Sequence, residues 1–210
     1  MRLRKVSPQK IIAGDHAFLT LTDECYYLQP YECPHAGSAS DLIFGLKNNR
    51  PEAIAYAAAL LSSLLPRQWV QAYTFLTIPS SSPRFPEPSA AILSAAGVRD
   101  IREIKQVANT PPSHLAWRHL PMDLAQLYVL AEHPQRPAPR NVVIFDDVLT
   151  TGSHFRAAKM AARHRWKSAS IVGLFIARTC PRWRHCAGGP CADEAHGRAG
   201  PLSMAHWSHG

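Results

Sequence analysis

Residues 142–154 read Val-Val-Ile-Phe-Asp-Asp-Val-Leu-Thr-Thr-Gly-Ser-His, and this order of side chains decides the fold class. The first four residues form an unbroken β-branched and aromatic run, which is typical of a strand buried on both faces of a parallel sheet. Gly152 and the polar residues around it predict a turn, and an amphipathic pattern from Phe155 to Arg163 predicts a helix. The stretch therefore predicts the strand, turn and helix of an α/β fold.

Two adjacent carboxylates, Asp146 and Asp147, stand at the C-terminal end of this predicted strand. In open α/β sheets ligands bind at such ends, where two carboxylates can accept hydrogen bonds from the hydroxyls of a ribose. Gly152 lets the backbone approach an anion, and the N–H and hydroxyl groups of residues 149–154 would face that anion at a helix N-terminus. The pattern indicates a sugar-phosphate site. The alternative is a capped helix without a ligand, in which two buried acids would be costly.

The stretch resembles the PRPP-binding motif of type I phosphoribosyltransferases, which runs from an apolar strand through two acidic and two apolar residues to Thr-Thr-Gly-x-Thr. Only His154 departs, because the family has a second threonine there. Beyond the motif, the chain is similar to the competence-protein ComF branch. Three further features carry this similarity: Tyr31 with Asp41–Lys47 and the alanine- and leucine-rich helix behind it, Ile78-Pro79, and Lys105–Arg118. No paired cysteines precede Tyr31, so the zinc finger of many ComF proteins is missing, which weakens a role in DNA uptake.

The resemblance implies a doubly wound, mainly parallel sheet with a flexible hood loop. It implies catalysis by Asp146, Asp147 and Lys105, with Lys105 reaching the leaving pyrophosphate; a lysine that is merely exposed is the alternative. PRPP would bind, together with Mg²⁺ held mainly by PRPP itself and no dedicated metal ligands. The residues implied to bind PRPP are Pro79, Ser80, Ser81, Val148, Leu149, Thr150, Thr151, Gly152, Ser153 and His154.

The composition is compatible with several partners. The chain has 210 residues, 46% of them hydrophobic, and a net charge of +8, which attracts anions without specifying them. The basic N-terminus lacks an apolar signal region and no stretch approaches the roughly 20 apolar residues of a membrane span, so we expect a cytoplasmic protein. Five cysteines without a Cys-x-x-Cys pair argue against a disulfide framework. Cys180, Cys186 and Cys191 leave a zinc site open.

Three parts are expected: a strand pair with its connection in residues 1–36, an α/β domain in 37–179, and a loosely ordered Cys-, His- and Gly-rich tail in 180–210. The strand pair is predicted in residues 17–31, around an Asp-Glu turn. The remaining predicted elements are helices at 42–46 with a Ser38 or Ser40 cap, at 52–64 after Pro51 and at 87–96 before Gly97, and strands at 70–78, 101–107 and 169–177.

Residues 114–132 mix a helical pattern with Pro121, and no element is assigned to them.

Three functions are compatible with these observations. The first is a PRPP- and Mg²⁺-dependent phosphoribosyltransferase whose acceptor base or amine is unidentified. The second is a protein that senses PRPP or a nucleotide without turnover, which His154 and the serine-only loop after Pro79 favour. The third is a ComF-like accessory factor that binds single-stranded DNA, which the positive charge favours. A homodimer is left open.

Overall fold

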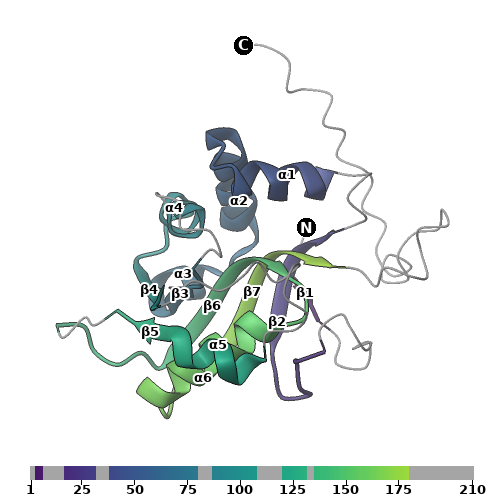
Figure 1. Ribbon diagram of the computed structural model, residues 1–210. Helices are drawn as coiled ribbons and strands as arrows, with labels where there is room; N and C mark the ends of the chain where they lie inside the picture. Colours follow the sequence, from purple (N-terminus) through teal and green to yellow (C-terminus); the bar gives the residue numbers. More distant parts are fainter. Residues whose placement is uncertain are drawn as a thin grey trace, which may run out of the picture.

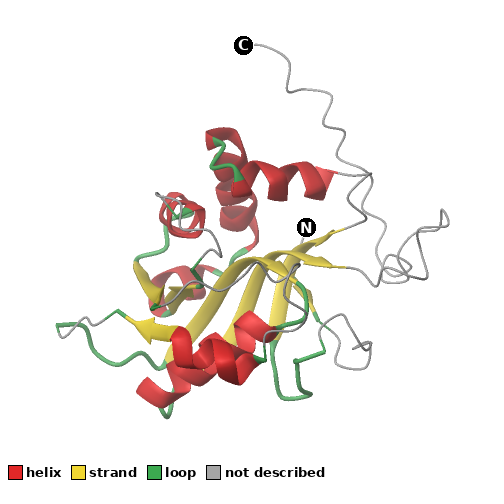
Figure 2. Ribbon diagram, in the orientation of Figure 1, coloured by secondary structure: helices red, strands yellow, loops and turns green. Residues whose placement is uncertain are grey.

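The predicted buried strand is β6 (Asn141–Leu149), and the helix after it is α6 (Ser153–Arg165). They belong to a computed structural model that describes residues 3–6, 17–31, 38–79, 87–107, 120–131 and 135–179 (Figure 1, Figure 2). The other elements are β1 (Arg4–Lys5), β2 (Cys25–Tyr31), α1 (Ser38–Lys47), α2 (Pro51–Leu64), α3 (Arg67–Ala72), β3 (Thr74–Thr77), α4 (Pro88–Ala95), β4 (Asp100–Gln106), α5 (Pro121–Leu127), β5 (Tyr128–Leu130) and β7 (Ser170–Thr179).

The strands form one mixed sheet in the order β1-β2-β7-β6-β3-β4-β5. The five inner strands are parallel, whereas β1 and β5 pair antiparallel at the two edges. β6 lies in the middle of the sheet, with Val142 opposite Thr74 of β3 and Ile171 of β7. The expected α/β class with a mainly parallel sheet is confirmed, and the N-terminal strands β1 and β2 belong to the same sheet.

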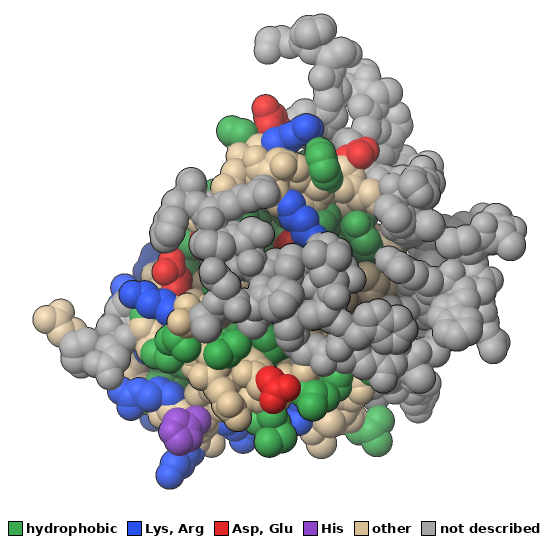
Figure 3. All heavy atoms as spheres, in the orientation of Figure 1, with side chains coloured by type: hydrophobic (Ala, Val, Ile, Leu, Met, Phe, Trp, Pro, Cys, Tyr) green, Lys and Arg blue, Asp and Glu red, His purple; other side chains and the backbone are tan. Residues whose placement is uncertain are grey.

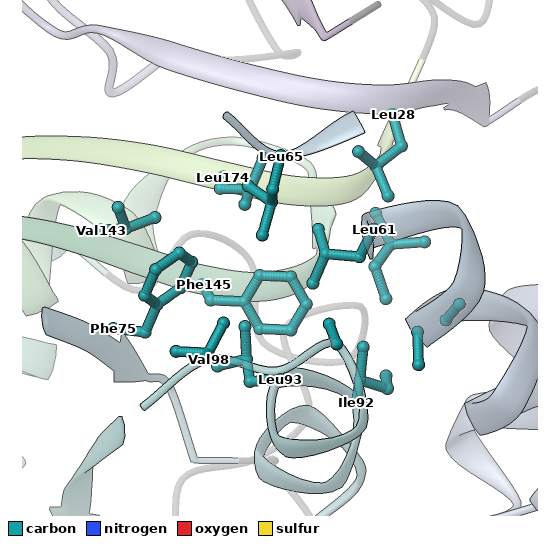
Figure 4. Packing of buried hydrophobic residues seen from close by; sticks show 14 of the residues in the cluster. Leu28, Leu61, Leu65, Phe75, Ile92, Leu93, Val98, Val143, Phe145 and Leu174 are labelled. Atoms are coloured by element: carbon teal, nitrogen blue, oxygen red, sulfur yellow. The ribbon is translucent and has the colours of Figure 1, made fainter. Parts of the chain in front are cut away.

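Helices cover both faces of the sheet. Successive β6 side chains point to opposite sides, so they pack in two different cores. Val143 and Phe145 pack in a first core with α1, α2 and α4. Figure 4 shows the ring of Phe145 in this core, next to Phe75 and Leu93. Val142 and Ile144 pack in a second core with α5 and α6. All four β6 side chains are fully buried, which explains the continuous apolar run.

The connections that leave the neighbouring strands β3 and β6 run over opposite faces of the sheet. From β3 the chain crosses through α4 in the first core, and from β6 it crosses through α6 in the second core. β3 and β6 are neighbours, so the chain leaves this pair in opposite directions. In doubly wound sheets such a point opens a crevice at the carboxyl ends of the strands, where ligands bind.

Several predicted elements are confirmed. Pro51 starts α2, and its fixed φ and missing N–H suit a first helical position. Gly97, with φ +84°, follows α4. The strands predicted at 101–107 and 169–177 are β4 and β7. The amphipathic pattern of α6 is kept at Ala158 and Ala162, which are buried, whereas Met160 is 38% exposed.

The predicted strand pair in residues 17–31 is wrong. Only residues 25–31 form a strand, and its neighbours are β1 and β7. Residues 20–23 turn, because the Thr20 N–H donates to the Asp23 carboxylate and the Asp23 N–H donates to the Thr20 carbonyl. Asp23 is held by α6, so the segment before β2 lies across that helix instead of beside the strand.

The strand predicted at 70–78 is also too long. Pro66 caps a short helix, α3, in which the Trp69 N–H bonds to the Pro66 carbonyl and the Trp69 side chain is buried, so β3 begins only at Thr74.

Ser40 lies inside α1 and not at a cap. Pro121, in the stretch to which the sequence assigns no element, is the first residue of α5, where proline is tolerated. No helix in the described ranges combines the length and apolar character needed to cross a bilayer.

Candidate functional site

The two acids are the sixth and seventh of the nine residues of β6. The strand continues past them to Leu149, so they are not its final residues as predicted. Both side chains are half-buried, and the Asp147 N–H donates a hydrogen bond to Asp146 Oδ1 at 2.9 Å. The register with β7 is kept through Leu149, which fixes the backbone that carries both carboxylates.

The negative charge of Asp146 is held in an unfavourable environment. Burial raises the pKa of Asp146 well above its ordinary value, and the charge of Asp147 raises it further. The Asp147 N–H and the Lys47 ammonium act in the opposite direction and lower it. A carboxyl with a raised pKa in a crevice is a recognised mark of a functional site, although ion-pair networks also produce such shifts. A ligand that donates hydrogen bonds to these oxygens would relieve the strain.

Residues 149–154 form the bend between β6 and α6. Gly152 has φ +81°, a left-handed conformation that side chains with a Cβ rarely adopt, so the turn predicted at this glycine is confirmed. The Thr151 hydroxyl bonds to the Ser153 hydroxyl at 3.1 Å, and it also accepts the Ser153 N–H at 3.4 Å. Ser153 is buried, whereas Thr150 is exposed. Of these hydroxyls, Thr150 is the one that faces solvent without rearrangement.

A segment that the sequence analysis had placed in a strand covers this bend. The Phe18 N–H donates to the Thr151 carbonyl at 3.0 Å. The Leu19 side chain occupies the space beside Gly152, where a Cβ would lie 2.8 Å from Leu19 Cδ2. Asp23 then holds the segment to α6 through Arg156 and Lys159. The bend is therefore supported from behind by residues far away in sequence.

A small cavity lies between the acids and the bend. It is lined by Asp146, Val148, Leu149, Thr150, Gly152, His154, Phe155 and Phe175. Its volume is about 10 Å³, enough for a single water molecule. The predicted residues on β6, the bend and α6 are thus brought together. A phosphoryl group is larger than this cavity.

Tyr128 brings a group that the sequence analysis did not include. Its hydroxyl lies 2.6 Å from His154 Nδ1, and its ring is buried at the start of β5. Burial and the nearby charge of Asp146 raise the pKa of Tyr128, so the phenol keeps its proton at neutral pH. A proton on the phenol can be donated to Nδ1, which leaves the other ring nitrogen as the N–H donor. His154 therefore has a defined orientation at the edge of the cavity.

Tyr128→Phe is expected to lower the free energy of unfolding by about 1 kcal/mol, since one buried hydrogen bond is lost. Urea unfolding measures this change. Histidine-selective ¹⁵N NMR should show a changed signal for His154 Nδ1. Tyr73→Phe is the control, because the Tyr73 ring stacks on Trp69 and its hydroxyl has no hydrogen bond within the described residues. Equal effects of both variants, or an unaltered His154 signal, would contradict the assigned bond.

The loop after β3 is only partly described. The Ile78 N–H donates to the Phe145 carbonyl at 3.3 Å, so Pro79 follows directly beside the strand that carries the acids. Ser80 and Ser81 lie outside the described residues. Lys105 is exposed on β4 opposite Val129, and β3 separates its strand from β6. Within the described residues no contact joins Lys105 to the acids, and most of the predicted hood loop, residues 108–119, lies outside them.

The cysteine and metal predictions concern mostly other parts of the chain. Cys25 is buried in the second core, where it packs as a small hydrophobic side chain, and burial raises its pKa. Cys33, Cys180, Cys186 and Cys191 lie outside the described residues. Among the residues that the structure describes, no three His, Cys, Asp or Glu side chains gather where a metal ion could be held.

Comparisons with protein families and with curated proteins found no relative of this chain. No protein-family model matches the chain, and no curated protein matches it. A function is therefore proposed from the geometry above and from the resemblance of residues 142–154 to a known motif.

Proposed function

We propose that this protein is a type I phosphoribosyltransferase of the ComF-like kind, which transfers the phosphoribosyl group of Mg²⁺-PRPP to a nitrogen base or amine. One observation carries the proposal: two adjacent carboxylates precede a left-handed glycine bend on the central strand of a parallel sheet. They lie where the connections of β3 and β6 leave for opposite faces. This is the place where doubly wound sheets bind ligands.

The bend would hold the 5′-phosphate. A helix N-terminus presents unpaired N–H groups to an anion, and α6 begins directly after Gly152. Thr150 and the oriented ring of His154 would add donors. The mutual bond of Thr151 and Ser153 would open so that their hydroxyls turn to the phosphate. This opening enlarges the one-water cavity and makes the bound and free states different.

Asp146 and Asp147 would accept hydrogen bonds from the two ribose hydroxyls. These bonds favour the charged form of the carboxylates and relieve the raised pKa of Asp146. The carboxylates also stabilise the positive character that the ribose ring gains as pyrophosphate departs, which is an electrostatic contribution made mostly in the transition state. Lys47, whose charge already acts to lower the pKa of Asp146, would favour the ionised form of that carboxylate.

Pro79 with Ser80 and Ser81 would hold the pyrophosphate beside the carboxyl end of β6. Half-buried carboxylate oxygens suit Mg²⁺, a cation that prefers oxygen ligands and keeps several waters. Bound with PRPP, it would neutralise charge on the leaving group. Lys105 would approach that group on closure of residues 108–119. The acceptor nitrogen forms a bond to the anomeric carbon as the bond to the pyrophosphate oxygen breaks, and it then loses its proton.

Calorimetric titration of the full chain with PRPP in the presence of Mg²⁺ tests the proposal. We expect saturable binding that falls when ribose replaces PRPP, because the phosphate sites supply most of the interaction. Release of pyrophosphate across a panel of purines, pyrimidines and amines then identifies the acceptor. Absence of PRPP binding at both low and high Mg²⁺ would refute the proposal.

A second function is PRPP or nucleotide sensing without turnover. The position of Lys105 favours it, because within the described residues nothing brings that side chain to the acids. Tight PRPP binding without pyrophosphate release for any acceptor would favour sensing over catalysis. A Lys105→Ala variant separates the two, since only an enzyme loses turnover while its PRPP affinity is largely kept.

A further inference from the structure

A second cavity lies at the opposite end of the sheet from the 149–154 bend. It is about 90 Å³ in volume, far larger than the recess beside the acids, and three arginines and Trp166 contribute to its lining. Arg102 stands near the start of β4, Arg136 lies in the connection before β6, and Arg165 ends α6. Because the inner strands are parallel, the starts of β4 and β6 lie away from the carboxyl end that carries Asp146.

Arg102 is a buried charge fixed in one orientation. Its side chain is 7% exposed. Its Nε and Nη2 donate to the Asp100 carboxylate at 3.3 and 3.1 Å, and Nη2 also donates to the Pro137 carbonyl at 3.0 Å. Its guanidinium carbon lies 5.4 Å from the centre of the Trp166 ring, within the range of a cation–π interaction. Within the described residues, Nη1 makes no hydrogen bond.

The positive charge around the cavity exceeds the negative charge. Arg136 Nη1 donates to the same carboxylate at 3.0 Å and to the Ile101 carbonyl at 3.3 Å. Arg165 has no hydrogen bond or ion pair with the part of the chain that the structure describes. Among these residues three guanidinium groups therefore face one carboxylate, Asp100. A partly enclosed space with uncompensated cations and free N–H donors favours an anion.

The helix dipole of α6 explains only part of this arrangement. Basic residues in the last turn of a helix interact favourably with its carbonyl end, which accounts for Arg163 and Arg165. It does not account for Arg102 and Arg136, which come from other elements and converge on the same space. In Figure 3, Lys and Arg side chains gather at the lower left, over the end of α6.

We propose that this cavity is a phosphate-binding site, separate from the crevice at the acids, which takes a phosphoryl group between Arg102, Arg136 and Arg165. The planar guanidinium groups present paired N–H donors that match phosphate oxygens. The phosphoryl group belongs either to a free phosphorylated metabolite or to the terminal phosphate of a nucleic acid. Both present the same doubly charged group to the three arginines.

Titration of the full chain with inorganic phosphate, followed by calorimetry and by the indole N–H signals in ¹⁵N NMR, tests the site. Arg165→Gln and Arg136→Gln are each expected to weaken phosphate binding about 10-fold, the loss of one charge-assisted pair. Both side chains are substantially exposed, so these variants should fold. Arg163→Gln is the matched control, because it removes the same charge from the same helix end without lining the cavity. The Trp166 indole signal, assigned with Trp166→Phe, should shift with phosphate in the wild-type protein.

Two oligonucleotide probes distinguish the sources. Arg165-dependent binding of inorganic phosphate, without binding of a 5′-phosphorylated oligonucleotide, assigns a small phosphorylated ligand. Arg165-dependent binding of a 5′-phosphorylated oligonucleotide, with none of its unphosphorylated counterpart, assigns a nucleic-acid end. Equal weakening by Arg163→Gln and Arg165→Gln indicates a general basic surface and overturns the proposal, as does the absence of Arg165-dependent binding of either phosphate probe. The readout is independent of PRPP, so failure here leaves the phosphoribosyltransferase proposal standing, and the reverse also holds.

Discussion

Replacement of Asp23 by alanine is expected to lower the free energy of unfolding by about 3–5 kcal/mol, because it breaks a buried ion pair on one side only. The Asp23 carboxylate has no exposed surface, and it accepts hydrogen bonds from Lys159 at 2.6 Å and from Arg156 at 3.2 Å. The Thr20 N–H and hydroxyl supply two more at 2.8 and 3.0 Å. Without the carboxylate, the ammonium of Lys159, a residue of α6, stays mostly buried with no opposite charge. Equilibrium unfolding in urea measures the loss.

Lys5→Ala is the control for Asp23→Ala. Lys5 pairs with Glu24, but its side chain is 57% exposed and that of Glu24 is 42% exposed, so the pair is screened by solvent. We expect its removal to cost less than about 1 kcal/mol. A loss of similar size in the two variants would show that Asp23 does not anchor the N-terminal segment as described.

The Asp23 cluster also predicts an acid-sensitive component of stability. Burial by itself would raise the pKa of Asp23, but the Lys159 hydrogen bond, the Thr20 N–H and the charges of Lys159 and Arg156 together lower it below its ordinary 3.8. The folded state therefore holds the ionised form more strongly than the unfolded chain does. This contribution is complete only at pH values well above the ordinary pKa, and it disappears as the pH falls through the lowered one. In Asp23→Asn the decline over this range should be smaller.

Asp146→Asn is expected to stabilise the ligand-free protein while it weakens PRPP binding by about 10-fold or more, the loss of charge-assisted bonds to a ribose. Because burial and Asp147 raise the pKa of Asp146, the folded state binds its proton more tightly than the unfolded state. The free energy of unfolding then falls as the pH rises from the ordinary pKa through the raised one. Asparagine keeps the shape and the acceptor for the Asp147 N–H but removes the charge.

A gain of about 1 kcal/mol from Asp146→Asn corresponds to a rise of about 2–4 °C in Tm for a domain of this size. Thermal unfolding at pH 7.5 and calorimetric titration with PRPP measure the two effects. Asp123→Asn is the control, because Asp123 is an exposed acid in the first turn of α5 and should change neither quantity appreciably. Lower stability without a change in PRPP affinity would assign Asp146 a purely structural role. If Asp146→Asn raises the stability but the wild-type protein binds no PRPP, the electrostatic effect is confirmed and the proposed function is not.

The elements that were correctly predicted are those with local causes. Pro51 at the start of α2, Gly97 after α4 and Gly152 before α6 each act through their own backbone, whatever surrounds them. The wrong predictions arose where distant contacts prevail over the local pattern. Residues 17–24 alternate like a strand, yet Asp23 fastens them to α6, and α3 forms because the buried Trp69 packs in the first core.

Sequence alone determined that a buried apolar strand ends near two carboxylates and a glycine bend, because burial of such a run and the left-handed turn are properties of adjacent residues. Tertiary structure alone decided what surrounds them. Lys47, Tyr128 and Leu19 reach the acids and the bend from other elements, and Arg102 meets Arg136 and Arg165 at the far end of the sheet. The sequence states which side chains can be charged. The burial and the neighbouring groups that set the energy of each charge come from distant parts of the chain, as when Lys159 binds Asp23 across more than a hundred residues.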